Sequence, residues 1–399
     1  MFFLLSDKFV AISQTNEDKD LSIISLFDLK TTDKSQISID LKQFESNEDK
    51  NSDQKESDKN GKINYSLICG HFSKNSKHLA VCDNRKNLIV FKDIDNNWKQ
   101  IFKSKVSRNC IHLFFSLNNN SVICGHKSGD VFEYDFEIEG NESLGGRLLL
   151  GHCSMLLDLI QTQDSKYLIT SDRDEKIRVS YYPNTYNIES YCLGHKEFVS
   201  SIDTIDNKTL ISGSGDGSLR IWNISDGKQL EVLTCDPNET IEDNHKNGTQ
   251  FPVKKLVTDV KSGAKYLAVS FYKQSIVKIY SIDSLSLKLI HTLSLSEEPI
   301  DILFDVLESD VLWILLPKCE NPIEIYKISS DKTSKVNIYE NVVKQLNSNE
   351  CFGNQCLNES KTDELSGLYK HWFNNVETYL QKKNERQEVM AKKKKFTRL

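Results

Sequence analysis

Histidines are the residues of this 399-residue chain whose type could most readily support acid–base chemistry or metal binding. Four of the nine follow a glycine, namely His71, His126, His152 and His195. None has a carboxylate or a cysteine at a recognisable catalytic or metal-ligand spacing. No P-loop, H-E-x-x-H motif or nucleophile elbow occurs either. The sequence therefore predicts no catalytic residue and no histidine metal site.

A glycine-rich segment, GSGDG at residues 213–217, has the spacing of loops that cradle the carboxylate of S-adenosylmethionine or a dinucleotide phosphate. Such loops lead from a strand into a helix whose N-terminus faces the ligand. The residues that follow here, SLRIWNI, have the pattern of a strand, which makes the glycines a hairpin turn. We therefore expect no bound cofactor and no methyltransferase active site in this chain.

The ten cysteines are scattered and form no C-x-x-C pair. The two that lie closest in sequence, Cys351 and Cys356, stand in a polar segment without a matching pair elsewhere. Cys69, Cys82 and Cys124 fall in apolar, strand-like runs, where free thiols are usually buried and inert. This usage predicts reduced structural cysteines, no metal site, and a reducing compartment such as the cytosol or nucleus.

One segment, DRDEKIR, carries six charges in seven residues. Its charged members are Asp172, Arg173, Asp174, Glu175, Lys176 and Arg178. Ile177 and Val179 alternate with Lys176 and Arg178, so a strand that buries the first pair directs the second pair to the outer face. Two interpretations follow: an ordinary solvated hairpin, or a surface that binds a partner.

The net charge of −6 is unevenly distributed. Residues 380–399 hold eight Lys or Arg and two Glu, a balance of +6, so the remainder carries −12. The basic residues considered for RNA contact are Lys382, Lys383, Arg386, Lys392, Lys393, Lys394 and Lys395. Nuclear import, contact with RNA phosphates and simple solvation are all compatible with such a tail. No apolar run approaches the roughly 18–20 residues needed to cross a bilayer, so no membrane association is expected.

An internal repeat gives the clearest organisation. Gly151-His152 recurs as Gly194-His195 after 43 residues, and Asp174 recurs as Asp216 after 42, the period of a four-stranded propeller blade. The units resemble WD repeats, in which a His, a Ser or Thr, a turn Asp and a Trp form a hydrogen-bonded set.

In the second unit the set would be His195, Ser212 or Ser214, Asp216 and Trp222. In the first unit it would be His152, Thr170 and Asp174, with Ser180 in the place of Trp. A unit opening at Gly70-His71 has Arg85 at its turn, so the repeats are degenerate. Because each buried polar group needs a partner, the role of these residues is structural.

Further strand clusters on both sides bring the number of blades to about seven. The expected fold is all-β, a seven-bladed WD-repeat propeller with a C-terminal helix and a basic tail. Propellers of this kind are usually closed by lending the N-terminal strand to the last blade, which would give the FFLL at residues 2–5 a partner.

The expected division of the chain is a propeller at 1–340, a linker at 341–361, a C-terminal helix at 362–390 and the basic tail at 391–399. Residues 45–60 contain no apolar side chain, so we expect a disordered loop at about 42–62, inside the first blade. A second polar loop is expected at about 234–250, between blades. Leu368, Trp372, Val376 and Leu380 repeat every four residues, as on one face of a helix.

The segments GHCSMLLDLI, YLITSDRDEKIRVSYYP and LGHKEFVSS resemble the WD-repeat, non-catalytic subunit of eukaryotic tRNA (guanine-N7)-methyltransferase. The resemblance is close within 151–202, fainter over 66–233, and reappears in YLQKKNERQE near the C-terminus. It implies a propeller that binds and stabilises a separate catalytic subunit as a heterodimer, which methylates N7 of a variable-loop guanosine in tRNA.

On this resemblance the partner subunit binds S-adenosylmethionine, the charged hairpin at 172–178 faces that subunit, the tail touches tRNA, and the complex is nuclear, with the cytoplasm as a second location. The competing hypothesis is a substrate receptor of a ubiquitin ligase, or a general scaffold, since propellers serve many functions. Ligase receptors of this type usually carry W-D-x-R, whereas Trp222 is followed by Asn223.

Overall fold

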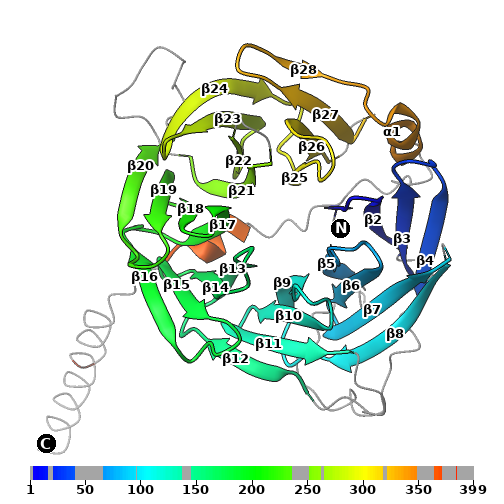
Figure 1. Cartoon of the computed structure of the whole chain (residues 1–399), viewed down its shortest axis with the longest axis horizontal. Helices are drawn as coiled ribbons and strands as arrows, with labels where there is room; N and C mark the ends of the chain where they lie inside the picture. The colour runs from blue at the N-terminus through cyan, green and yellow to red at the C-terminus, as the bar shows by residue number, and fades with distance from the viewer. Residues whose placement is uncertain are drawn as a thin grey trace, which may run out of the picture. The chain divides into compact units, whose positions relative to one another are not determined.

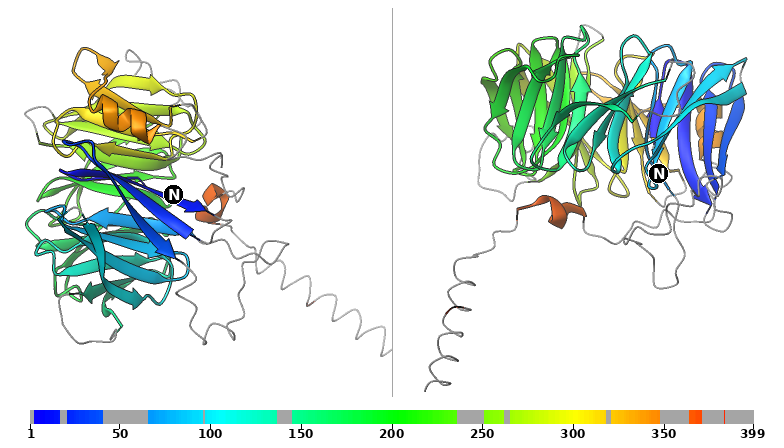
Figure 2. Two further views of the ribbon diagram at one scale, coloured as in Figure 1. Left: turned by 90° about the vertical axis from the view of Figure 1, so that its right-hand side faces the viewer. Right: turned by 90° about the horizontal axis from the view of Figure 1, so that it is seen from below.

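In the computed structural model of the chain, residues 3–16, 21–40, 66–95, 97–136, 145–235, 251–261, 265–317, 321–347, 364–370 and 383 are described. The chain divides into two compact units, Met1–Thr362 and Asp363–Leu399. The first unit consists of seven four-stranded antiparallel sheets set as blades around a common axis (Figure 1). Seen edge-on, the blades lie side by side in one layer (Figure 2). The prediction of a seven-bladed propeller is confirmed.

The first four blades follow one another along the chain. Blade 1 contains β1 (Phe3–Leu5), β2 (Phe9–Asn16), β3 (Leu21–Asp28) and β4 (Lys34–Asp40). Blade 2 contains β5 (Leu67–Phe72), β6 (His78–Asp83), β7 (Asn87–Ile94) and β8 (Asn97–Lys105). Blade 3 contains β9 (Cys110–Phe115), β10 (Ser121–His126), β11 (Asp130–Asp135) and β12 (Arg147–Gly151). Blade 4 contains β13 (Leu156–Gln161), β14 (Tyr167–Asp172), β15 (Lys176–Tyr181) and β16 (Ile188–Leu193).

The remaining three blades and the helices complete the described chain. Blade 5 contains β17 (Val199–Asp206), β18 (Thr209–Ser214), β19 (Ser218–Asn223) and β20 (Gln229–Thr234). Blade 6 contains β21 (Val253–Asp259), β22 (Tyr266–Phe271), β23 (Ile276–Asp283) and β24 (Ser286–Ser294). Blade 7 contains β25 (Asp301–Phe304), β26 (Val311–Leu315), β27 (Ile323–Ile328) and β28 (Thr333–Lys335). The helices are α1 (Glu340–Leu346) and, in the second unit, α3 (Glu364–Leu368).

Burial changes from the inside of each blade to its outer edge. The second strands, such as β14, β18 and β22, are buried at every position because neighbouring blades cover both of their faces. Their sequences are accordingly near-continuous apolar runs with small polar residues. The outer strand β20 instead alternates half-buried and exposed residues. The core therefore lies between blades, and each blade is held by its two neighbours.

Closure of the ring differs from the prediction. β1 pairs with β2 in its own blade, with Phe3 opposite Ile12, and all four strands of blade 7 come from residues 301–335. Side-chain packing joins the two ends: Phe3 lies against Trp313 of β26, with ring centroids 6.0 Å apart, inside a cluster shared by blades 1 and 7. Because that packing buries the N-terminal apolar residues, they need no strand partner in the last blade.

Helix α1 contributes to the same closure. Residues from 341 onward were expected to form a linker, but α1 lies beside blades 1 and 7 (Figure 1). It buries Val342 and Leu346 completely in the cluster between these blades. The Asn347 side chain then accepts a hydrogen bond from the Ile323 backbone N–H at 3.0 Å and donates one to the Ile323 carbonyl. The seven residues of α1 are too short for their periodicity to be recognised in the sequence.

The predicted loops lie almost wholly outside the described residues. The segment predicted as a disordered loop, 42–62, follows β4 and precedes β5, so the flanking strands place it between blades 1 and 2, not inside blade 1. Residues 236–250 separate blades 5 and 6, as expected. Of the predicted C-terminal helix, only 364–370 and Lys383 are described. No helix among the described residues is long and apolar enough to span a membrane.

Candidate partner-binding surface

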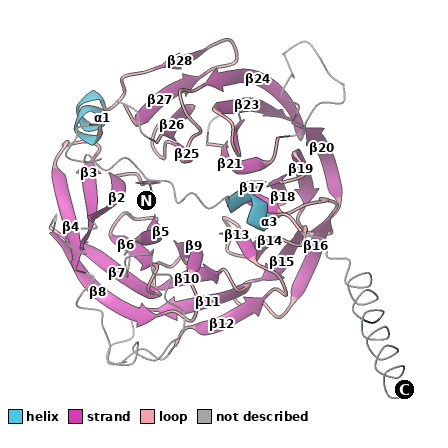
Figure 3. Cartoon of the chain, turned by 180° about the vertical axis from the view of Figure 1, so that it is seen from behind, coloured by secondary structure: helices cyan, strands magenta, loops and turns pink. Residues whose placement is uncertain are grey.

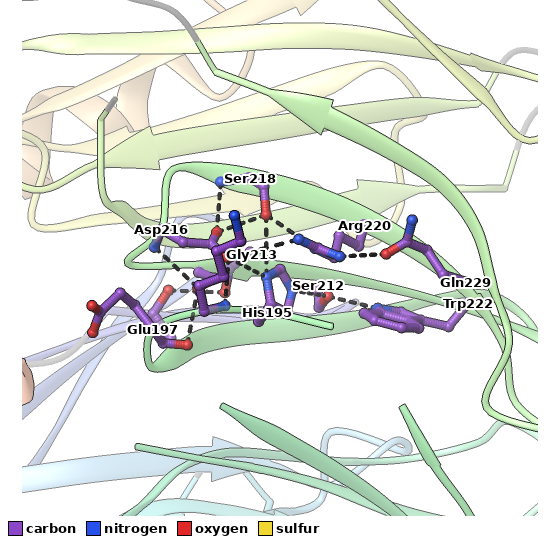
Figure 4. Close-up of polar contacts among 12 residues, drawn as sticks. His195, Glu197, Ser212, Gly213, Asp216, Ser218, Arg220, Trp222 and Gln229 are labelled. Carbon is purple, nitrogen blue, oxygen red and sulfur yellow. Dashed lines mark hydrogen bonds and ion pairs between the residues drawn. The ribbon is translucent and has the colours of Figure 1, made fainter. Parts of the chain in front are cut away.

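Blade 5 contains the hydrogen-bonded set that the repeat predicts (Figure 4). His195 Nδ1 lies 3.2 Å from Asp216 Oδ2, and His195 Nε2 lies 2.7 Å from Ser212 Oγ. Ser212 Oγ also accepts a hydrogen bond from Trp222 Nε1 at 2.8 Å. Ser212, not Ser214, is therefore the strand residue of the set. Ser212 and Trp222 are completely buried, so the set ties strands together inside the blade.

Electrostatics support this structural role. Burial alone would raise the pKa of Asp216, but hydrogen bonds from His195 and Ser218 outweigh burial and hold that pKa well below its ordinary value. Burial lowers the pKa of His195, although Asp216 opposes the effect. The imidazole is thus kept neutral beside a charged carboxylate that accepts several hydrogen bonds. The glycines that follow β18 form the predicted hairpin turn, with Gly217 at φ +73°.

Blade 4 uses a different carboxylate from the one that the repeat alignment predicts. His152 Nδ1 lies 2.9 Å from Asp172 Oδ2, and His152 Nε2 lies 2.7 Å from Thr170 Oγ1. The prediction that Asp174 completes this set is wrong. Asp172 is the last residue of β14, and its other carboxylate oxygen accepts the backbone N–H of Lys176 across the turn. Relative to Asp216 in blade 5, the carboxylate of blade 4 therefore comes from a residue two positions earlier, whereas the two histidines occupy equivalent positions.

This geometry also revises the predicted partner surface. Asp172 is only 1% exposed, so it acts inside the blade. The prediction that Asp172 binds a partner at the surface is wrong. Arg178 is half-buried and donates hydrogen bonds to Ser180 Oγ at 2.9 Å and to the carbonyl of Thr185 at 2.9 Å. In the strand register Arg178 corresponds to Arg220 of blade 5, and Ser180 occupies the position of Trp222.

The charges that remain at the surface are those of the turn itself. Lys176 is exposed, and Arg173, Asp174 and Glu175 are half-buried. Glu175 has a left-handed backbone, φ 71°, which reverses the chain between β14 and β15. We call residues 173–176 the charged turn.

Large apolar side chains are exposed on the outer strands of three neighbouring blades, which Figure 3 shows at the rim as β12, β16 and β20. Together with Tyr186, in the loop before β16, we call them the outer apolar strip: Leu148, Tyr186, Ile188, Tyr191, Leu193, Leu230 and Val232. Tyr186 is 75% and Leu193 62% exposed. In the sheet register Leu193 lies directly opposite Lys176, so the strip adjoins the charged turn. Exposed apolar groups beside charges are typical of a protein-binding surface.

This strip was not predicted from the sequence, because apolar residues in a strand pattern indicate a blade without showing which of them face outward. The alternation in β16, where Ile188, Tyr191 and Leu193 are exposed while Cys192 is buried, is visible once the strand is known to be an outer one. Of the basic residues predicted to contact RNA, Lys383 is described and exposed. Lys382, Arg386 and Lys392 to Lys395 lie outside the described residues.

Two Gly-His pairs do not open a repeat. His71 lies within the inner strand β5, and His126 is the last residue of β10. The dipeptide alone therefore does not mark a blade boundary. His126 is fully buried, and its Nδ1 lies 3.1 Å from Ser107 Oγ.

A pocket of about 420 Å³ is lined by inner strands, with His71, His112 and Asp203 among its residues. His112 Nδ1 lies 2.8 Å from Asp158 Oδ1, and burial raises the pKa of Asp203 to about 6, features that can accompany catalysis. Both carboxylates, however, accept backbone N–H groups of the next blade: Asp158 from Ile202 and Asp203 from Thr258. These hydrogen bonds join adjacent blades, which gives both carboxylates a structural role.

Comparison with known proteins agrees with the fold and the repeat. Residues 137–339 match the family model described as tRNA methyltransferase TRM82 WD40 domain. A chain of the solved structure described as "Crystal Structure of Mitotic Checkpoint Complex" has a TM-score of 0.61, covering 82% of this chain and 90% of that chain. Its sequence identity of 12% means that this likeness concerns the fold alone.

Curated relatives share the name tRNA (guanine-N(7)-)-methyltransferase non-catalytic subunit. The wdr4 protein of Danio rerio is 33% identical, covering 82% of this chain and 79% of the relative. The WDR4 protein of Homo sapiens is 32% identical over 79% of this chain and 76% of its own length. The wuho protein of Drosophila grimshawi is 39% identical over 43% of this chain and 44% of its own length. The chain therefore belongs to the WD-repeat family of non-catalytic subunits of tRNA (guanine-N7)-methyltransferase.

Proposed function

We propose that this propeller binds a separate catalytic subunit as a heterodimer and stabilises it for N7-methylation of a guanosine in the tRNA variable loop. The observation that carries the proposal is the adjacency of the charged turn and the outer apolar strip on blade 4. Apolar anchors beside charged groups supply both binding energy and orientation for a protein partner. S-adenosylmethionine is then bound by the catalytic subunit, and this chain holds the enzyme in its active arrangement.

The basic tail, from Lys382 to Arg398, is proposed to contact tRNA phosphates in the complex, and the nucleus is the proposed location, with the cytoplasm as a second one. The support is chemical: a cluster of Lys and Arg suits a polyanion, and lysine-rich runs also direct nuclear import. The acidic remainder of the chain, with a net charge of −12, does not suit tRNA, which makes the tail the better candidate.

The functional test is the N7-methylguanosine content of tRNA from cells that lack this chain, read by chemical cleavage at the modified base. We expect the modification to be lost and to be restored by the wild-type chain. Full retention of the modification in those cells would mean that the family relationship does not carry the function in this protein.

The interface test compares two exposed lysines on different blades. We expect Lys176→Glu to weaken binding of the catalytic subunit at least tenfold, since disrupting an interfacial charge pair costs roughly 2–5 kcal/mol. Lys288→Glu makes the same charge change on the exposed face of β24 in blade 6 and should leave binding unchanged. Equal affinities for both variants and the wild type, measured by titration calorimetry, would exclude the charged turn from the interface.

A further inference from the structure

Four buried cysteines converge where blades 2 and 3 meet. Cys69 comes from β5, Cys82 from β6, Cys110 from β9 and Cys124 from β10, so four separate strands each supply one thiol. All four belong to one core cluster. The other described cysteines, Cys153, Cys192 and Cys235, lie outside this cluster.

The sulfurs are close enough for one metal ion to reach three of them. The Sγ atoms of Cys69, Cys82 and Cys110 all lie within 4.8 Å of one another. Cys69 and Cys82 are direct cross-strand partners, and Cys110 approaches them from the neighbouring blade. Cys124, on the adjacent strand β10 of blade 3, is packed in the same core cluster. Zinc–sulfur bonds of about 2.3 Å place tetrahedral ligands about 3.8 Å apart, so small rotations bring the first three sulfurs to that spacing, and Cys124 is the candidate for the fourth position.

The surroundings suit a closed site. Cys82, Cys110 and Cys124 are completely buried, and Cys69 is 8% exposed. The walls are apolar and include Val106, Leu113 and Val122. Structural zinc sites are enclosed and four-coordinate in this way, whereas catalytic sites keep an open position for water.

The number of thiols in one core cluster favours a metal ion over a disulfide. A disulfide would use only two of these sulfurs, at a separation of about 2.05 Å, and would leave the other two without a role.

We propose that Cys69, Cys82, Cys110 and Cys124 form a structural site for Zn²⁺ that joins blade 2 to blade 3. Coordination releases the four thiol protons to solvent and leaves a zinc tetrathiolate centre with a net charge of −2. The ion makes the contact between the two blades stronger than apolar packing alone. This site is independent of the proposed role in tRNA methylation.

The first test uses the full-length chain purified without chelators. Elemental analysis is expected to give about one zinc per chain. Chain unfolded with chelator and refolded with added ZnCl₂ should bind zinc more tightly than about 10 nM, as other structural cysteine sites do. Refolding with Co²⁺ should produce the intense thiolate-to-cobalt charge-transfer absorption of a sulfur-rich tetrahedral site.

The second test locates the ion by substitution. Cys82→Ala combined with Cys110→Ala should lower the zinc content at least tenfold and abolish the cobalt absorption. Cys192→Ala removes an equally buried thiol in blade 4 and should retain both signals. Alanine is chosen because it leaves no unsatisfied polar group in the core.

Three results would overturn the proposal. The wild-type chain could refold without taking up zinc or cobalt, the double variant could keep the wild-type zinc content, or mass spectrometry could find a disulfide between two of the four cysteines. The cobalt spectrum of the wild-type chain decides the question even if the double variant does not fold.

Discussion

Single residues show how the same hydrogen-bonded set is built with different spacing in neighbouring blades. In blade 5 the histidine partner is Asp216, two residues beyond the end of β18, whereas in blade 4 it is Asp172, the last residue of β14. The hydrogen bond requires only that the carboxylate lie within about 3 Å of the imidazole. A residue two positions earlier in the sequence can therefore supply the carboxylate. Ser180 occupies the tryptophan position of blade 4 and accepts a hydrogen bond from Arg178 Nε.

A pair of substitutions separates the two aspartates of blade 4. Asp172→Ala leaves His152 without its acceptor in a buried site and is expected to lower the free energy of unfolding by about 1–3 kcal/mol. Asp174→Ala changes a half-buried turn residue and should alter it by less than about 0.5 kcal/mol. Urea denaturation of both variants measures the difference. An equal loss of stability in the two would contradict the assignment of Asp172 to the set.

His71 gives a prediction about pH. Burial, with a smaller effect from His112, lowers the pKa of His71 from 6.5 to about 4. Between these two values the unfolded chain binds a proton that the folded chain does not, so stability falls as pH decreases from 6.5 to 4. The decrease attributable to His71 is at most about 3 kcal/mol. Unfolding of the wild type and of His71→Gln, measured across this range, should show a shallower slope for the variant.

The partly exposed His291 provides the control for that measurement. His291→Gln removes one histidine of β24 and should keep the wild-type slope. If the free energy of unfolding varies with pH equally in His71→Gln and the wild type, the His71 imidazole does not contribute to the loss of stability at low pH.

At the scale of elements, helix α1 packs into the cluster that joins the two ends of the ring. Blades 1 and 7 share no strand, and the cluster between them includes Phe3, Trp313 and the two buried residues of α1. Trp313 also donates a hydrogen bond from Nε1 to Asp305 Oδ2 at 2.8 Å, so its large ring is fixed in the cluster. Side-chain packing therefore does here what a shared strand does in other propellers.

Removal of one buried side chain from α1 tests this role. Leu346→Ala creates a cavity between blades 1 and 7 and is expected to lower the free energy of unfolding by about 2–5 kcal/mol. Lys344→Ala, on the exposed face of the same helix, should change it by less than about 0.5 kcal/mol. Chemical denaturation followed by circular dichroism measures both. A small effect of Leu346→Ala would show that the ring closes without α1.

At the scale of the whole molecule, the surfaces proposed to bind partners belong to different parts of the chain. The charged turn and the outer apolar strip belong to blades 3 to 5, while the basic tail belongs to the second unit. A protein partner and an RNA partner can therefore be recognised by separate groups, one through apolar contact and the other through charge.

Truncation of the tail tests the second of these roles. If the tail contacts tRNA phosphates, deletion of the residues after Leu380 should reduce the dependence of tRNA binding on salt concentration, because fewer counterions are then released from the RNA. The complex with the catalytic subunit should still form. Filter binding at several salt concentrations gives the slope, and an unchanged slope would remove the tail from RNA recognition.

The sequence by itself determined the architecture, because the repeat of 42–43 residues and the apolar runs of the second strands are local signals. It also determined the set around His195 and the position of the charged hairpin. Tertiary structure alone decided which carboxylate reaches His152, how blades 1 and 7 are joined, and which apolar residues face outward on β16. These three features depend on distances between strands, which cannot be derived from the order of residues along the chain.

The cysteines show the difference most clearly. The absence of a C-x-x-C pair argued against a metal site, but that argument considers only neighbours along the chain. Cys69, Cys82 and Cys110 meet because β5 and β6 pair in one blade and β9 packs against them from the next. Strand register and blade packing bring these thiols together, and both are properties of the folded ring.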